Sequence, residues 1–336
     1  MTLPKFNYLA PKDLEEASAA LNDYNGRIAV FAGGTELVMH LKWRIKTPDY
    51  LLSLKNLTEL RTIQYDENSG FTLGAAVSLR NLGADASIKS ELPALAQAAD
   101  RVAIPQIRGM ATIGGNICLD TRCWYHDRTK EWRTTFPPCY KAGGDRCHVV
   151  KGGKQCYALF QADTVPCLLI LKAKLKLVHF AGERIIPIEE FYSGFGKVPN
   201  RVSSNEILTQ IHIPKLPPHS GTAYLKWSKR KTLEFPILGI ACQVRLDTQR
   251  KRCEEARFAL TGCDSKLLSI EATELLMDLN EPVIPADLVD HLLREVKPVA
   301  HMGVSAHLKR RICRVLIQKA FYDSWKMAQR SKTGFS

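Results

Sequence analysis

The feature that most constrains this chain is a stretch, residues 116–160, that has no sustained helix or strand period and lies between two regularly patterned regions. Glycines, prolines and charged residues crowd it, and it holds half of the chain's cysteines. A structureless loop of this length is rare inside a compact domain unless a ligand fixes it or it has a function. The sequence therefore predicts an ordered loop, with its cysteines as the candidate groups that order it.

Four of these cysteines have a spacing that limits what they can bind. Cys123, Cys139, Cys147 and Cys156 are 16, 8 and 9 positions apart, and Cys118 lies 5 positions before the first. Zinc sites gather their ligands through close pairs, and no such pair occurs here. Four thiolates spread along a loop suit an iron–sulfur cluster, because each iron of a cubane takes one cysteine. A mixed zinc site with nearby histidines and unliganded thiols remain the alternatives. The five scattered cysteines are expected to be core or surface thiols: Cys167, Cys242, Cys253, Cys263 and Cys313.

The regions on either side of this loop predict a mixed α/β domain followed by an α+β domain. Strands are expected at residues 28–32, 50–54, 174–179 and 207–213, with a hairpin across 61–76. Helices are expected at 13–24, 36–44, 92–103 and 163–171. After a cluster of prolines at 214–218 come three predicted strands (223–229, 237–246, 256–261) and then three helices (265–279, 286–296, 306–328). The prolines mark the expected domain boundary.

Two paired-glycine segments are candidates for holding a diphosphate. In Val30-Phe31-Ala32-Gly33-Gly34-Thr35-Glu36-Leu37 a strand ends at two glycines and a helix begins, and Ala111-Thr112-Ile113-Gly114-Gly115-Asn116 is the second segment. Glycines let backbone amides approach a phosphate, and a helix N-terminus adds free N–H groups. Neither segment matches the standard dinucleotide or nucleoside-triphosphate motifs. Each alone is also compatible with a plain turn, but two in one domain favour a diphosphate ligand.

Charge and targeting signals narrow the class of protein. The net charge of +13, from 47 basic and 34 acidic residues, favours anionic partners. No apolar stretch is long enough for a membrane span, and the N-terminus does not resemble a signal peptide, so a cytoplasmic protein without a membrane partner is expected. The basic residues are scattered, so nucleic-acid binding is not expected. A zinc-stapled nucleic-acid-binding module is kept only as a remote alternative.

Taken together, these segments resemble the FAD-binding medium subunit of the molybdenum hydroxylases, a family that includes the flavin subunits of xanthine dehydrogenase and carbon monoxide dehydrogenase. The resemblance rests on both glycine segments, on Ala162-Asp163 before an apolar helix, and on Glu206-Ile207-Leu208 leading to Ile211-His212-Ile213-Pro214. Residues 116–123 and the spacing to Cys156 resemble one branch, the beta subunit of 4-hydroxybenzoyl-CoA reductase, which has an additional [4Fe–4S] cluster. The implied fold is α+β: a two-subdomain, PCMH-type FAD-binding domain at 1–217 with an iron–sulfur insertion at 117–160, then a domain of a three-stranded antiparallel sheet plus helices at 222–330.

The resemblance also implies a set of ligand-binding residues. FAD would contact the segment from Val30 to Leu37 through its diphosphate, with the second loop supplied by Ala111, Thr112, Gly115 and Asn116. Val102 and Leu208 would lie against the flavin, Asp120 and Asp163 would hydrogen-bond the cofactor, and Lys226 would reach its polar edge. The [4Fe–4S] cluster would be held by Cys123, Cys139, Cys147 and Cys156, with Cys118 packed near the flavin. We expect no catalytic residue on this chain and no covalent bond to FAD.

The implied function is electron transfer within a larger oxidoreductase complex. Electrons would pass from ferredoxin through the cluster and FAD to a small subunit with two [2Fe–2S] clusters, and then to molybdopterin on a large subunit that reduces an aryl-CoA substrate. A dimer of such heterotrimers is expected. The alternative is a xanthine-dehydrogenase-like hydroxylase whose flavin subunit passes electrons outward.

Overall fold

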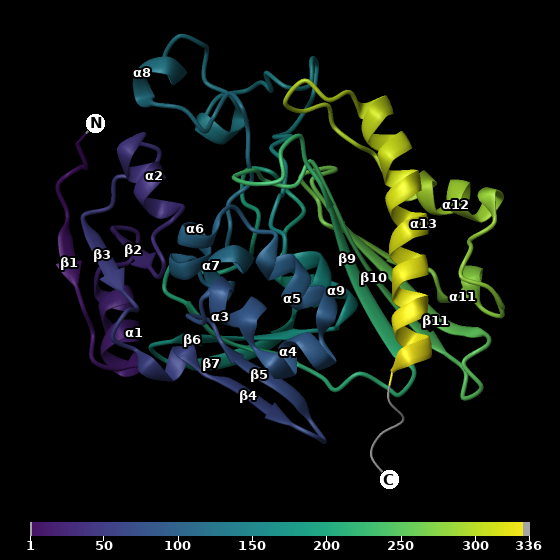
Figure 1. Ribbon diagram of the computed structural model, residues 1–336. Coiled ribbons are helices and arrows are strands. Elements are labelled where there is room, and N and C mark those ends of the chain that lie inside the picture. Colours follow the sequence, from purple (N-terminus) through teal and green to yellow (C-terminus); the bar gives the residue numbers. More distant parts are fainter. Residues whose placement is uncertain (1, 332–336) are drawn as a thin grey trace.

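The computed structural model describes residues 2–331 and contains three sheets (Figure 1). The N-terminal sheet is parallel and small, with the strand order β1-β3-β2. Its elements are β1 (Asn7–Leu9), α1 (Leu14–Asp23), β2 (Ile28–Phe31), α2 (Leu37–Lys42) and β3 (Tyr50–Ser53). Helix α1 begins where the Asp13 side chain accepts a hydrogen bond from the Glu16 N–H at 2.8 Å, which caps the helix. The first glycine segment, with Gly33 and Gly34, forms the turn between β2 and α2 of this sheet.

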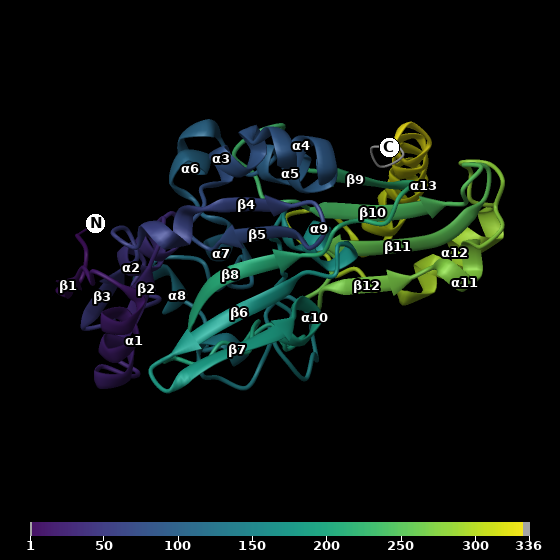
Figure 2. The same cartoon turned by 90° about the horizontal axis from the view of Figure 1, so that it is seen from below.

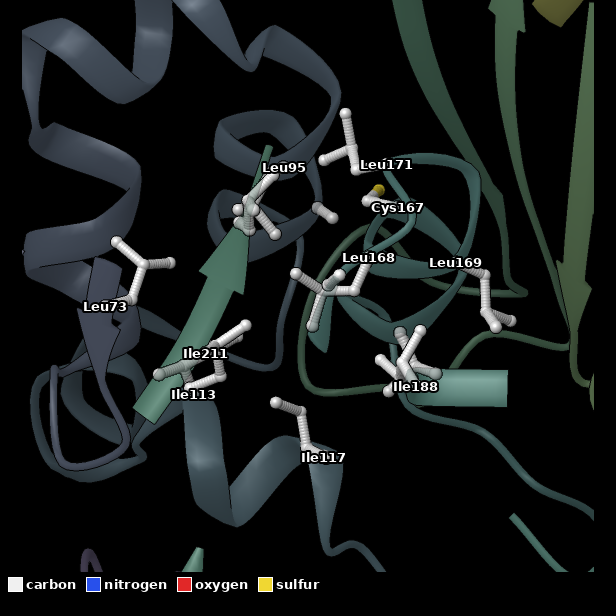
Figure 3. Close-up of a cluster of buried hydrophobic side chains, with 14 of the residues drawn as sticks. Leu73, Leu95, Ile113, Ile117, Cys167, Leu168, Leu169, Leu171, Ile188 and Ile211 are labelled. Atoms are coloured by element: carbon white, nitrogen blue, oxygen red, sulfur yellow. The ribbon is translucent and has the colours of Figure 1, made fainter. Parts of the chain in front are cut away.

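The second sheet is antiparallel and has the order β4-β5-β8-β6-β7 (Figure 2). Its strands are β4 (Ile63–Asp66), β5 (Gly70–Gly74), β6 (Lys174–His179), β7 (Gly182–Pro187) and β8 (Ile207–Ile213). The accompanying helices are η1 (Thr58–Arg61), α3 (Leu79–Ala84), α4 (Ala86–Glu91), α5 (Pro93–Asp100), α6 (Pro105–Met110), α7 (Ile113–Ile117), α9 (Val165–Ile170) and α10 (Ile188–Phe191). Figure 3 shows the core between this sheet and α7, α9 and α10, where Leu73, Ile113, Leu168 and Ile211 are fully buried.

The C-terminal part is a four-stranded antiparallel sheet, order β12-β11-β10-β9, covered by helix α13 (Figures 1 and 2). Its elements are β9 (Ser220–Trp227), β10 (Leu238–Leu246), β11 (Cys253–Thr261), β12 (Leu268–Glu271), α11 (Thr273–Leu276), α12 (Ala286–Leu292), η3 (Leu293–Glu295) and α13 (Ala306–Arg330). The predicted α+β fold class is confirmed, but the prediction of three strands is wrong. The fourth strand, β12, occupies part of the predicted helix at 265–279, because Leu268 and Ile270 alternate with polar residues and pair with β11.

The cysteine segment carries little regular structure, as the sequence predicted. Between α7 and α9 it contains α8 (Lys130–Arg133) and η2 (Tyr140–Ala142). Its two ends are joined by an antiparallel bridge between Arg122 and Leu159, with N–H to O distances of 2.7 and 2.9 Å in the two directions. The segment 122–159 is therefore a closed loop that leaves the fold and returns at one place. Within residues 2–331, no helix has the length and apolar character that crossing a membrane would require.

Candidate functional site

A cavity of about 860 Å³ is the main candidate site. Its walls come from β2 and the glycine turn that follows it, from α7 and the start of the cysteine segment, and from two later segments at 200–208 and 233–235. This volume falls in the range of cofactor-binding clefts. Of the residues predicted to bind a cofactor, all border the cavity except Phe31 and Lys226. The sequence therefore located most of one wall, although the segments at 200–204 and 233–235 carry no motif that would have revealed them.

The first glycine turn presents bare backbone to this cavity. A Cβ on Gly33 would lie 2.0 Å from the Met110 carbonyl oxygen, so any side chain there would push two backbone segments apart. Gly34 has a φ of +71°, a left-handed conformation that other residues rarely adopt. The Phe31 ring lies beside Gly34, where an added Cβ would come within 2.7 Å of it, and its centre is 6.5 Å from that of the Tyr8 ring. Close backbone packing therefore explains Gly33, whereas the left-handed backbone and the neighbouring ring explain Gly34.

The second glycine segment forms a short helix, α7, where the sequence suggested a loop. Thr112 caps it by accepting a hydrogen bond from the Gly115 N–H at 3.0 Å. Gly114 is required because a Cβ there would lie 2.7 Å from the Ala75 carbonyl oxygen. Asn116 uses its side-chain oxygen to accept hydrogen bonds from the backbone N–H and the hydroxyl of Thr164. The segment is thus fixed against β5 and α9 while Thr112, Gly115 and Asn116 still border the cavity.

Asp163 is a buried carboxylate at the cavity wall. It accepts a hydrogen bond from the Tyr224 hydroxyl at 2.8 Å, and Lys226 Nζ lies 3.0 Å from it. Burial raises the pKa of Asp163 to about 6, although Lys226 and Tyr224 act in the opposite direction. Lys226 Nζ also donates to the carbonyl oxygens of Arg101 and Glu234, at 2.9 and 2.8 Å. The ammonium of Lys226 is therefore engaged within the protein, where it joins three chain segments beside the cavity.

Three further predicted residues border the cavity in different ways. Leu208 is buried on β8, and Val102 is partly buried against the same core. Asp120 lies 2.8 Å from Lys141 Nζ. Neither Lys141 nor Arg122, which lies 2.6 Å from Glu36 Oε1, was singled out by the sequence analysis. Arg122 stands within residues 116–123, which carry the resemblance, and Lys141 was counted only as part of the general positive charge; no motif signals the ion pairs that they form.

The cysteines predicted to bind a cluster lie around a second, small pocket. Cys123, Cys139, Cys147 and Cys156 line it together with aromatic and basic side chains from the same segment: Tyr125, Tyr140, Lys141, Arg146, His148 and Tyr157. Burial raises the pKa of the Cys123 thiol to about 11 and also raises that of Cys156. Within residues 2–331, no three His, Cys, Asp or Glu side chains lie close enough together to hold a single metal ion. A cubane differs in this respect, because each of its four thiolates binds a different iron.

Cys118, His126 and His148 lie at different places relative to the four-cysteine pocket. Cys118 borders the large cavity and not the small pocket, and it is exposed, whereas the other four cysteines of the segment are partly buried. His148 lines the small pocket, with Nε2 2.8 Å from the Pro137 carbonyl oxygen. His126 lies outside the pocket lining, with Nδ1 3.3 Å from Asp127 Oδ1. The structure therefore places four cysteines around the small pocket and the fifth at the large cavity, and the assignment of the four as cluster ligands stays a prediction.

The comparisons with known proteins define the class. The family "FAD binding domain in molybdopterin dehydrogenase" matches residues 4–216, and "CO dehydrogenase flavoprotein C-terminal domain" matches residues 223–324. The chain belongs to this family, the FAD-binding medium subunits of the molybdenum hydroxylases, and is thus an oxidoreductase subunit that binds FAD.

Individual relatives extend over nearly the whole chain. A putative xanthine dehydrogenase FAD-binding subunit of Escherichia coli is 30% identical over 320 residues, covering 95% of each chain. The carbon monoxide dehydrogenase medium chain of Hydrogenophaga pseudoflava is 26% identical, covering 97% of this chain and 99% of its own. A solved structure of carbon monoxide dehydrogenase from that organism matches the fold with a TM-score of 0.78 at 24% identity, covering 97% of this chain and 99% of that chain.

The residues present fit the cofactor that the family implies. A flavin dinucleotide needs a long cleft with backbone exposed to its diphosphate, and the cavity provides both at Gly33, Gly34 and Gly115. The small pocket is lined by four cysteine thiols.

Proposed function

We propose that this chain holds FAD and one [4Fe–4S] cluster in a molybdenum-containing aryl-CoA reductase similar to 4-hydroxybenzoyl-CoA reductase. The observation that carries the proposal is the small pocket around Cys123, Cys139, Cys147 and Cys156, which lies on an insertion attached to the flavin-binding fold. An extra redox centre beside the flavin suits a subunit that receives electrons from a one-electron donor. Reduced ferredoxin is the donor we propose, with electrons moving toward molybdenum.

The cavity residues have distinct roles in this proposal. The segments from Val30 to Leu37 and from Ala111 to Asn116 hold the FAD diphosphate with backbone N–H groups. Val102 and Leu208 provide apolar contact for the flavin, and Asp120 and Asp163 accept hydrogen bonds. Lys226 acts through Asp163 and the Arg101 and Glu234 carbonyls, which it holds in place. FAD is bound without a covalent link, because neither glycine segment contains a His or Cys.

The partners follow from the same proposal. When bound, FAD exchanges electrons singly or in pairs and so matches one-electron clusters to a two-electron reduction. A small subunit with two [2Fe–2S] clusters and a large subunit with molybdopterin complete the complex, as a dimer of heterotrimers in the cytoplasm. The division into domains at 1–217 and 222–330, with the insertion at 117–160, belongs to this proposal as well.

A second candidate is a xanthine-dehydrogenase-like hydroxylase with outward electron flow. The Escherichia coli relative, whose name assigns it to xanthine dehydrogenase, favours this candidate. In that case the insertion would serve as an electron exit.

Analysis of the purified complex tests the proposal. We expect iron and acid-labile sulfide in excess of two [2Fe–2S] clusters by four atoms of each, FAD that is released on denaturation, and oxidation of reduced ferredoxin that depends on an aryl-CoA thioester. Zinc in place of the extra iron would refute the cluster. Turnover of a purine, with none of the thioester, would favour the hydroxylase.

A further inference from the structure

The flavin cavity is bordered by acidic side chains, an unusual wall for a cofactor that carries a diphosphate. Four carboxylates in this wall lie within 3.0 Å of a cationic side chain. The pairs are Glu36–Arg122 at 2.6 Å, Asp120–Lys141 at 2.8 Å, Asp163–Lys226 at 3.0 Å and Glu206–Arg184 at 2.6 Å. Each pairing cancels a negative charge that would otherwise repel an anionic ligand.

Two of these cations come from the cysteine segment. Arg122 lies at the Arg122–Leu159 bridge that closes the segment, next to Cys123. Lys141 lies between Cys139 and Cys147 in the sequence. Their side chains are 15% and 5% exposed, so water screens these two pairs poorly. The other two cations are Arg184 on β7 of the five-stranded sheet and Lys226 on β9 of the C-terminal sheet. The insertion therefore neutralises half of the paired acidic wall.

Lys141 is fixed in this role by its hydrogen bonds. Its ammonium donates to Asp120 Oδ1 at 2.8 Å, to the Thr121 carbonyl oxygen at 2.7 Å and to Thr121 Oγ1 at 2.6 Å. A lysine has three N–H donors, and these three acceptors use all of them. Lys141 also lines the cysteine pocket, whereas Asp120 borders the flavin cavity. The Asp120–Lys141 pair is thus a wall that the two sites share.

Arg122, at the bridge that closes the cysteine segment, also connects this segment to the flavin cavity. One nitrogen, Nη1, reaches Glu36 in the first glycine turn, and Nε lies 3.2 Å from Asp127 Oδ2. Asp127 in turn accepts a hydrogen bond from the Cys123 N–H at 3.0 Å. The Arg122 guanidinium also covers the ring of Phe235 at 4.7 Å, and both side chains border the cavity. The position of Cys123 and the charge at Glu36 therefore depend on the same side chain.

We propose that the cysteine segment supplies the countercharges of the flavin site, with Lys141 and Arg122 as positioning residues for FAD. An unpaired Asp120 or Glu36 would place a negative charge in the wall of a site for an anionic cofactor. The fold of the insertion then determines FAD affinity even in protein that holds no cluster. This inference depends on FAD binding and is independent of the cluster, the substrate and the direction of electron flow.

A double-mutant cycle on the full-length chain tests it. FAD is removed, and the Kd for added FAD is measured by flavin fluorescence for the wild type, Lys141→Met, Asp120→Asn and the double variant. We expect Lys141→Met to raise the Kd by about tenfold to a hundredfold, because it leaves the Asp120 carboxylate in the wall of the site without its cation. The double variant should bind FAD better than Lys141→Met alone, because it removes the uncompensated charge. Lys141→Arg should recover most of the affinity.

The controls separate charge from folding. Lys151→Met removes an exposed lysine of the same segment and should leave the Kd within about twofold of the wild type. Far-UV circular dichroism of each variant verifies the fold. An unchanged Kd in Lys141→Met, or an equal loss in Lys141→Met and the double variant, would overturn the inference. Iron content is measured on the same samples. A wild type without iron would refute the proposed cluster and leave the cycle interpretable.

Discussion

The flavin cavity and the cysteine pocket share a wall, yet they are built by different means. The cavity is formed where backbone packs on backbone, with Gly33 against Met110 and Gly114 against Ala75. The pocket is formed by side chains on an irregular loop that is closed by a single bridge at Arg122 and Leu159. The cavity is therefore a property of the fold itself. The pocket depends on its own side chains and on whatever they bind.

The largest expected effect separates the two sites by their ligands. If the proposed [4Fe–4S] cluster is present, replacing any one of Cys123, Cys139, Cys147 or Cys156 with serine should abolish it, because a hydroxyl is a poor substitute for a thiolate at iron. Cys118→Ser should leave the iron content unchanged, since Cys118 borders the other site. Iron and sulfide analysis, with electron paramagnetic resonance of the reduced protein, measures this. Full iron in all five variants would show that the pocket holds no cluster.

Two glycine substitutions, one beside the flavin cavity and one in the cysteine segment, test whether each site can be disrupted without the other. A Cβ on Gly33 would lie 2.0 Å from the Met110 carbonyl oxygen, and one on Gly144 would lie 1.8 Å from the Pro138 carbonyl oxygen. Gly33→Ala should therefore lower FAD occupancy severely and spare the iron, whereas Gly144→Ala should lose iron and weaken FAD less. Each overlap forces a backbone shift that costs on the order of 1–3 kcal/mol. Equal losses of both cofactors in both variants would contradict two separately built sites.

Ionic strength should distinguish delivery of electrons from binding of cofactors. The chain carries a net charge of +13, so an acidic ferredoxin should be attracted to it. Raising the salt concentration from about 0.05 to 0.3 M should slow ferredoxin-dependent reduction severalfold, because screening shortens the range of attraction below about 10 Å. FAD and iron contents should not change over the same range. A flat rate profile would remove the charge argument for the donor.

The smallest expected effect concerns pH and Asp163. Its pKa in the folded protein is about 6, raised from an ordinary value of 3.8. Well below pH 3.8 both the folded and the unfolded state hold the proton. Between pH 3.8 and 6 only the folded state keeps it, so the free energy of unfolding decreases across this window and levels off above pH 6. Urea unfolding of the wild type between pH 4 and 7 should show this decrease, on the order of 1–3 kcal/mol. Asp163→Asn should flatten that slope, and an unchanged slope would contradict the assignment.

The strands that the sequence located best are those whose pattern is set by burial. Predicted and observed bounds agree for Lys174–His179 and Ile207–Ile213, where the buried side chains include Leu175 and Leu177 of the first strand and Ile211 and Ile213 of the second. The predicted helix at 265–279 was wrong over Leu268–Glu271, which forms a strand because it pairs with β11, and only Thr273–Leu276 is helical. Local pattern cannot reveal that contact.

The candidate site shows the same division. Backbone requirements left glycines in the sequence, and these located the two turns beside the cavity. The ion pairs left no such signal in the sequence. The resemblance implied that Lys226 reaches the flavin, but it could not supply the bonds of Lys226 to Asp163, Arg101 and Glu234. Lys141 meets Asp120 only because the loop folds back on itself. Charge pairing across a loop is decided by tertiary structure, so sequence alone could not supply it.

The bridge between Arg122 and Leu159 has a consequence for how such a chain can be altered. Since the loop leaves and re-enters at adjacent residues, a short turn could replace everything between them without stretching the flanking backbone. A shortened chain would keep its sheets but leave Asp120 without Lys141. Exchange of this loop between flavin subunits would thus require little change in the backbone. A functional exchange would also have to transfer the acidic partners Asp120 and Glu36 together with Lys141 and Arg122.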